Sequence, residues 1–165
     1  MNGRLIVFLV TLGAVFMSGC AGWRQSLKPA TLTESREDRA KDAVRGFEER
    51  RDAAQLEAAL DRWKQGEVSR AEAMLSAIVN RRPDYADARV LLAEILWSRG
   101  DATAEGHLRA VLATNIGRAD AHHALALVLD GTGRAEEARQ HLSKAAELEP
   151  ENEVYRLTSE SLAVR

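Results

Sequence analysis

The stretch LLAEILWSRGDATAEGHL, residues 91–108, decides the fold, because similar stretches precede and follow it: AALDRWKQGEVSRAEAML at 58–75 and ALALVLDGTGRAEEARQHL at 124–142. Three residue types recur in phase: glycines, the alanines that follow them, and leucines four positions after the alanines. They are Gly66, Gly100 and Gly133; Ala71, Ala104 and Ala138; Leu75, Leu108 and Leu142. A shared period of about 34 residues predicts a repeated supersecondary unit.

Each unit is expected to be two antiparallel helices that reverse at the glycine. A reversal within a few residues places one residue in the left-handed region, which glycine enters at little cost. The alanines permit close approach of the two helices, and leucines four apart form an apolar stripe on the first helices: Leu92 with Leu96, and Leu125 with Leu129. A single pair of such helices cannot bury its apolar faces, so neighbouring units must stack. Between Gly100 and Ala104 the middle copy lacks one residue, which predicts an altered turn there.

Proline marks the end of two of the predicted hairpins. Pro83 and Pro150 end their second helices, because proline has no amide donor and clashes with the preceding turn. Asp84 and Asn152 follow at positions from which a side-chain oxygen is expected to cap the next helix. In the middle copy Ile116 replaces the proline.

Helix, glycine turn, helix and terminal proline at a period of about 34 residues resemble the tetratricopeptide repeat. The resemblance implies an all-α fold, an αα-superhelix of about three repeats with a charged helix before it and a capping helix after it. The expected boundaries are 34–52 for the charged lead-in helix and 53–165 for the repeat domain, with repeats at about 53–85, 86–118 and 119–152 and a cap at 153–165.

In tetratricopeptide domains the first helices of successive repeats line a concave face that holds a peptide or a helix of a partner. Mapped onto this sequence, that face contains Trp63, Lys64, Val90, Glu94, Trp97, His123, Leu127 and Asp130. Trp63 and Trp97 stand at equivalent positions of adjacent repeats, and two exposed aromatic anchors would form a binding centre. The alternative is that both rings are buried, Trp63 under the lead-in helix and Trp97 against the first repeat.

The segment 1–19 reads as an export signal. Arg4 precedes a largely apolar run from residue 5 to residue 17, which is too short for a comfortable membrane span. Ser18-Gly19-Cys20 follows, and it resembles the cleavage box of bacterial lipoproteins. The resemblance implies that Cys20 is acylated after removal of 1–19; the alternative is an uncleaved signal anchor. With no aspartate directly after Cys20, the enterobacterial sorting rule implies the outer membrane, facing the periplasm.

The segment 20–33 is expected to be a flexible tether, because it has small polar residues and no helical or strand period. In 34–52 acidic and basic residues alternate, and Ser35 with Asp38 has the spacing of a capping pair. Ala40, Val44 and Phe47 form a thin apolar stripe. This stripe either packs on the first repeat as a cap or binds a partner, a second copy included.

Composition excludes several function classes. The chain has 25 acidic and 23 basic residues, and such balanced charge gives no reason to expect nucleic acid. No zinc-protease pair, paired-cysteine site or nucleophile elbow occurs, so we expect neither enzymatic activity nor a cofactor. The four histidines are expected to be surface or packing residues rather than metal ligands, since adjacent side chains on a helix diverge by about 100°: His107, His122, His123 and His141.

The sequence therefore predicts a non-catalytic scaffold or adaptor, anchored to the bacterial envelope by lipid, that binds an envelope protein or peptide segment through its concave face. Two narrower alternatives share this architecture. One is a pilotin-like or secretion-system assembly lipoprotein, and the other is a regulator of a cell-wall enzyme.

Overall fold

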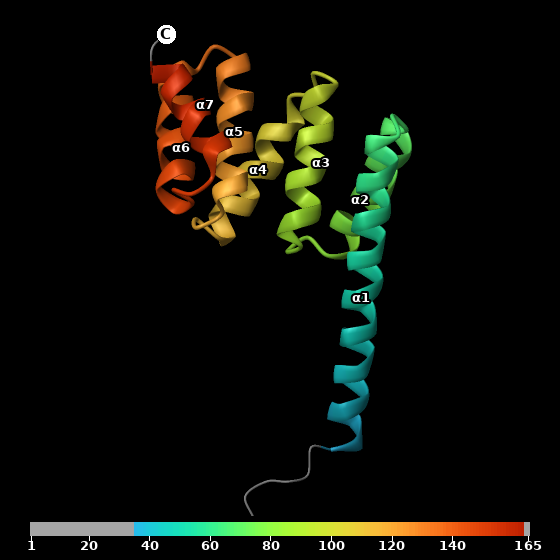
Figure 1. Ribbon diagram of the computed structural model, residues 1–165. Helices are drawn as coiled ribbons and strands as arrows, with labels where there is room; N and C mark the ends of the chain where they lie inside the picture. Colours follow the sequence, from blue (N-terminus) through green and yellow to red (C-terminus); the bar gives the residue numbers. More distant parts are fainter. Residues whose placement is uncertain (1–34, 164–165) are drawn as a thin grey trace, which may run out of the picture. The chain divides into compact units, whose positions relative to one another are not determined.

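The computed structural model describes residues 35–163, and this part of the chain is entirely helical and turn, without strands. Its helices are α1 (Arg36–Lys64), α2 (Val68–Arg81), α3 (Ala86–Ser98), α4 (Thr103–Thr114), α5 (Ala119–Gly131), α6 (Ala135–Leu148) and α7 (Glu153–Ala163) (Figure 1). The chain divides into two compact units, residues 1–46 and 47–165, and α1 begins in the first and ends in the second. The predicted all-α fold is confirmed.

The three phased glycines stand at the reversals between α1 and α2, α3 and α4, and α5 and α6. Gly66, Gly100 and Gly133 have φ angles of 80°, 76° and 82°, in the left-handed region that a side chain makes costly. In each turn the amide after the glycine returns to a helix carbonyl: Glu67 to Arg62, Asp101 to Leu96 and Arg134 to Leu129. The glycines therefore do what their spacing predicts.

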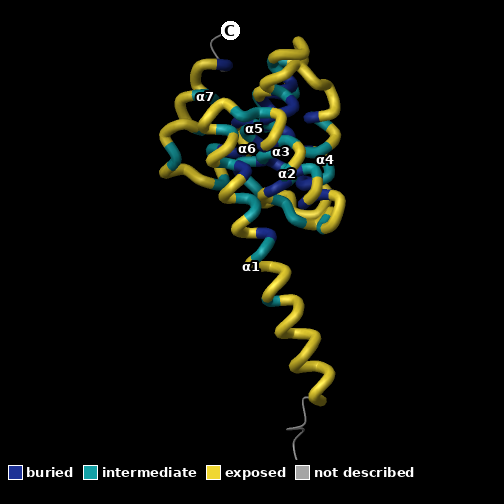
Figure 2. The backbone as a smooth tube through the Cα atoms, turned by 90° about the vertical axis from the view of Figure 1, so that its right-hand side faces the viewer, coloured by how far each residue is buried: buried dark blue, intermediate teal, exposed yellow. Residues whose placement is uncertain are grey.

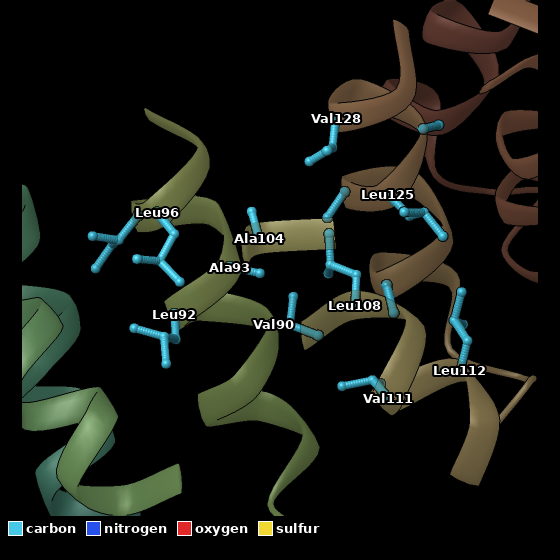
Figure 3. Packing of buried hydrophobic residues seen from close by; sticks show 14 of the residues in the cluster. Val90, Leu92, Ala93, Leu96, Ala104, Leu108, Val111, Leu112, Leu125 and Val128 are labelled. Carbon is cyan, nitrogen blue, oxygen red and sulfur yellow. The ribbon is translucent and has the colours of Figure 1, made fainter. Parts of the chain in front are cut away.

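Small residues hold the two helices of each hairpin close together. The three phased alanines, Ala71, Ala104 and Ala138, are fully buried, and so are Ala59, Ala93 and Ala126 on the first helices. The leucines of the second helices, Leu75, Leu108 and Leu142, are at most 1% exposed. Figure 3 shows side chains of α3, α4 and α5 in one continuous apolar layer, with Ala93, Ala104 and Leu108 between the helices. Neighbouring hairpins thus share a core, as stacked repeats must.

The predicted helix caps are confirmed at two of three places. Ser35 accepts a hydrogen bond from the amide of Asp38, and Asn152 accepts one from the amide of Val154. The prediction for Asp84 is wrong: α3 begins at Ala86, so Tyr85 occupies its N-cap position, and no side chain caps this helix. Tyr85 is half-buried against the core, and its ring lies under the guanidinium of Arg82, 5.0 Å away.

The shorter middle turn has its own cap. The Asp101 carboxylate accepts hydrogen bonds from the amide and the hydroxyl of Thr103, at 2.9 and 2.7 Å. The first of these bonds satisfies the Thr103 amide, a donor in the first turn of α4. The expected irregularity between Gly100 and Ala104 is therefore a capped turn.

The lead-in helix and the first repeat helix are continuous, because α1 crosses the expected boundary at residue 52 without a break. Val44 and Phe47 are exposed, at 58% and 62%. Figure 2 shows the first half of α1 as exposed. By contrast, Asp52 and Ala59 in its second half are fully buried.

A buried carboxylate ties α1 to the end of α2. The Asp52 side chain is fully enclosed; one oxygen accepts hydrogen bonds from Arg81 at 2.5 Å and Arg51 at 3.2 Å, and the other lies 3.6 Å from Arg82. Burial raises the pKa of Asp52, but the hydrogen bonds and charges of Arg81 and Arg51 outweigh it and hold that pKa below its usual value. The carboxylate is therefore ionised at neutral pH.

The last helix, α7, packs on α6 as a terminal helix of such an array does. Leu162 is buried on it, whereas Val154 and Leu157 are exposed. None of the helices in residues 35–163 is long and apolar enough to cross a membrane. The predicted export signal 1–19, Cys20 and the tether 20–33 lie outside the described residues.

Candidate functional site

The first helices of the three repeats meet around a hollow of about 230 Å³. Its lining is apolar except for one carboxylate and one imidazole: Trp63 of α1; Ala93, Glu94 and Trp97 of α3; Leu108 of α4; and His123, Ala124, Leu127 and Val128 of α5. Ala93, Leu108 and Val128 face this region from three helices in Figure 3. All of these residues belong to the unit 47–165.

The Trp97 ring occupies the space that a side chain at residue 131 would need. A Cβ on Gly131, the last residue of α5, would lie 2.3 Å from Cζ2 and 2.6 Å from Cη2 of the Trp97 ring. These distances are far below van der Waals contact, so only glycine lets the indole lie against the end of α5. Gly131 thus seats an aromatic wall of the hollow.

The two tryptophans are neither fully exposed nor fully buried. Trp63 and Trp97 both pack against the core and both line the hollow. Neither of the two alternatives drawn from the sequence, exposed anchors or buried rings, describes them fully. Each ring packs partly against the core and is partly accessible from the hollow. Half-buried aromatic side chains of this kind lose little conformational freedom when a partner binds, which favours a role as anchors.

Glu94 is the acidic residue of the hollow. It is half-buried and makes no hydrogen bond or ion pair among the described residues. Burial, with a smaller contribution from the charge of Asp120, raises the pKa of Glu94 above its usual value. Because the charged form is disfavoured and unpaired, this carboxylate costs the folded protein free energy instead of stabilising it.

His123 borders the same hollow from α5. Its ring lies 4.8 Å from the ring of Tyr155 in α7, and its Nε2 is buried without a hydrogen-bond partner among the described residues. Burial lowers the pKa of His123 below its usual value, so the imidazole is neutral at neutral pH. Glu94 is consequently the residue of the lining that can carry a negative charge.

Five of the eight residues expected on the concave face line this hollow: Trp63, Glu94, Trp97, His123 and Leu127. The other three lie elsewhere. Val90 is 6% exposed and belongs to the core, Lys64 is exposed, and Asp130 is half-buried outside the lining. Sequence analysis did not single out Gly131. The only hint in the sequence was its position directly before the predicted turn.

Of the remaining histidines, His107 is half-buried, with no hydrogen-bond partner for its Nδ1 among the described residues, whereas His122 and His141 contact each other. His122 is 4% exposed, and its Nε2 donates to the carbonyl oxygen of Ile116 at 3.0 Å. Its Nδ1 then accepts from Nδ1 of His141, 2.8 Å away in α6. Burial and the adjacent His122 lower the pKa of His141. Among residues 35–163 no group of three side chains is arranged to hold a metal ion.

Stacked helical hairpins with glycine reversals define an all-α tetratricopeptide repeat fold. In agreement, residues 56–106 match a tetratricopeptide repeat family model. A comparison with curated protein sequences found no match. More than a hundred solved chains resemble this one in structure.

Three solved structures illustrate the similarity. The first tetratricopeptide domain of human RPAP3 has 18% identity and a TM-score of 0.64, over 68% of this chain and 89% of that one. The type III secretion chaperone SycD of Yersinia enterocolitica, in complex with a peptide of the translocator YopD, has 16% identity and a TM-score of 0.59, over 68% and 86%. The pilF protein of Pseudomonas aeruginosa has 23% identity and a TM-score of 0.62, over 68% and 52%. At these identities the likeness concerns the fold.

Proposed function

We propose that the protein is a non-catalytic scaffold that binds a segment of another protein in the hollow between its first helices. The observation that supports this most is the meeting of Trp63 and Trp97, from adjacent repeats, at one hollow with an unpaired carboxylate. Aromatic anchors in a pocket are the usual centres of binding energy. Solved structures of the same fold hold peptides, among them the RPAP3 domain with an HSP90 peptide.

The proposed scaffold is attached to the bacterial envelope through acylated Cys20. Support comes from the sequence: the apolar run 5–17 and the small residues before the chain's single cysteine. Two or more acyl chains anchor a protein firmly, whereas one does so marginally. The partner would then be an envelope protein, on the periplasmic side of the outer membrane.

Replacing the cysteine tests the anchor directly. With Cys20→Ser, the protein should move from the membrane fraction to the soluble fraction, because the thiol that receives lipid is gone. Ser18→Ala is the matched control, since it retains the thiol and a small residue. A Cys20→Ser protein that stays on the membrane would rule out acylation and favour the uncleaved signal anchor.

A role in assembling a secretion system or pilus is the second candidate. The similarity to SycD with its bound translocator peptide, and to pilF, motivates it. Its distinguishing result is loss of secretin oligomers when the gene is deleted. Unchanged oligomers would leave the general scaffold as the proposal.

Site-specific cross-linking in intact cells tests the scaffold. A photo-activated residue in place of Leu127, exposed at the rim of the hollow, should capture one defined partner, whereas the same residue at Glu147, exposed on α6, should not. Capture of the same bands from both positions would show that the hollow is not the docking site.

A further inference from the structure

The hollow has the chemistry of a receptor for one cationic side chain. Its walls include two indole rings, and its acidic lining residue is Glu94. Aromatic faces attract cations through their quadrupole, and the attraction grows when water is excluded. A carboxylate beside such rings adds a charge-assisted hydrogen bond.

The hollow is a small, partly open depression of about 230 Å³ between side chains of α1, α3, α4 and α5. A partner that docks here is expected to insert one side chain and to lay its backbone across the first helices.

Charge decides which side chain fits. Several other half-buried carboxylates of the repeats form ion pairs within the protein: Glu105 and Glu137 bind Arg109 and Arg134, and Asp120 binds Arg118. Glu94 has no such partner among the described residues, and burial together with the nearby Asp120 raises its pKa. An acidic ligand would be repelled by Glu94, whereas a cation would relieve the cost of this half-buried, unpaired carboxylate.

We infer that the hollow binds a lysine or arginine side chain of an extended partner segment, with the cation between the Trp63 and Trp97 rings and paired to Glu94. This inference rests on the proposed function, because it names the chemistry of the segment that the scaffold holds. The exposed Leu127 at the rim supplies apolar contact for the stem of the same side chain.

The test uses an array of short peptides in which one central position is lysine, arginine, norleucine or glutamate in otherwise identical sequences. It is applied to the purified full chain in mild detergent. Peptides with a central lysine or arginine should bind about tenfold tighter than their norleucine counterparts, as one charged hydrogen bond predicts. Glutamate peptides should bind weakest.

Glu94→Gln should remove the preference for the cation while norleucine peptides bind as before. Glu147→Gln makes the same change of charge on the exposed surface of α6 and should leave binding unaltered. The melting temperature of Glu94→Gln should equal or exceed that of the parent, because an unpaired charge is lost; folding is therefore not at risk.

The outcomes separate the two proposals. If peptides bind and Trp97→Leu weakens them, but lysine has no advantage over norleucine, the cation receptor is overturned and the scaffold stands. If no peptide of the array binds, or if binding is indifferent to residue 97, both are overturned.

Discussion

Replacing Gly131 with alanine tests whether the Trp97 ring rests against the end of α5. The new Cβ would lie 2.3 Å from Cζ2, so the ring must retreat by about 1 Å to reach an ordinary contact of 3.4 Å. Overpacking of this kind costs about 1–3 kcal/mol. The gain in helix propensity from glycine to alanine is about 1 kcal/mol at most. We expect Gly131→Ala to lower the free energy of unfolding by about 1 kcal/mol.

Gly106 provides the matched control. It lies within α4, is exposed, and a Cβ there would meet no atom within 4 Å. Gly106→Ala should therefore raise the free energy of unfolding by about 0.5–1 kcal/mol through helix propensity alone. Urea unfolding followed by tryptophan fluorescence measures both variants. Equal stabilisation by the two alanines would refute the contact between Trp97 and Gly131.

Two further predictions concern the polar interior. Asp52→Asn should lower the free energy of unfolding by about 2 kcal/mol at pH 7, because charged hydrogen bonds to Arg81 and Arg51 are weakened. The difference should shrink in acid, as Asp52 protonates through its lowered pKa; a constant difference would contradict its role. Burial lowers the pKa of His123, so below about pH 6.5 the unfolded chain binds more protons than the folded chain does. The free energy of unfolding should therefore decrease as the pH is lowered through this range. His123→Phe should flatten that decline in thermal unfolding, and an unchanged slope would refute the assignment.

The repeat architecture is predictable because its determinants are local. A turn that needs positive φ requires glycine, and a close contact between two helices requires alanine, so both residues recur at fixed positions of the sequence. Gly66, Gly100 and Gly133 therefore identify the reversals from sequence alone, and the spacing of Trp63 and Trp97 places both rings on one side of adjacent repeats.

The features that could not be predicted from the sequence depend on contacts between residues that are distant in the chain or on packing against the core. Gly131 is explained only by the Trp97 ring of the preceding repeat, and Asp84 fails as a cap because Tyr85, which packs on the core, occupies the N-cap position. Val90 is assigned to the surface by its position in the repeat, yet it is buried. Repeat register fixes the side of a helix, but neighbouring hairpins decide how deeply each side chain is covered.

Hydrogen exchange of the protein with its cross-linked partner tests the central claim most directly. Amide protection reports which helices a partner stabilises. The account predicts added protection in the second half of α1, in α3 and in α5, the three helices whose side chains surround Trp63 and Trp97. Protection confined to α2, α4, α6 or α7 would contradict docking in the hollow.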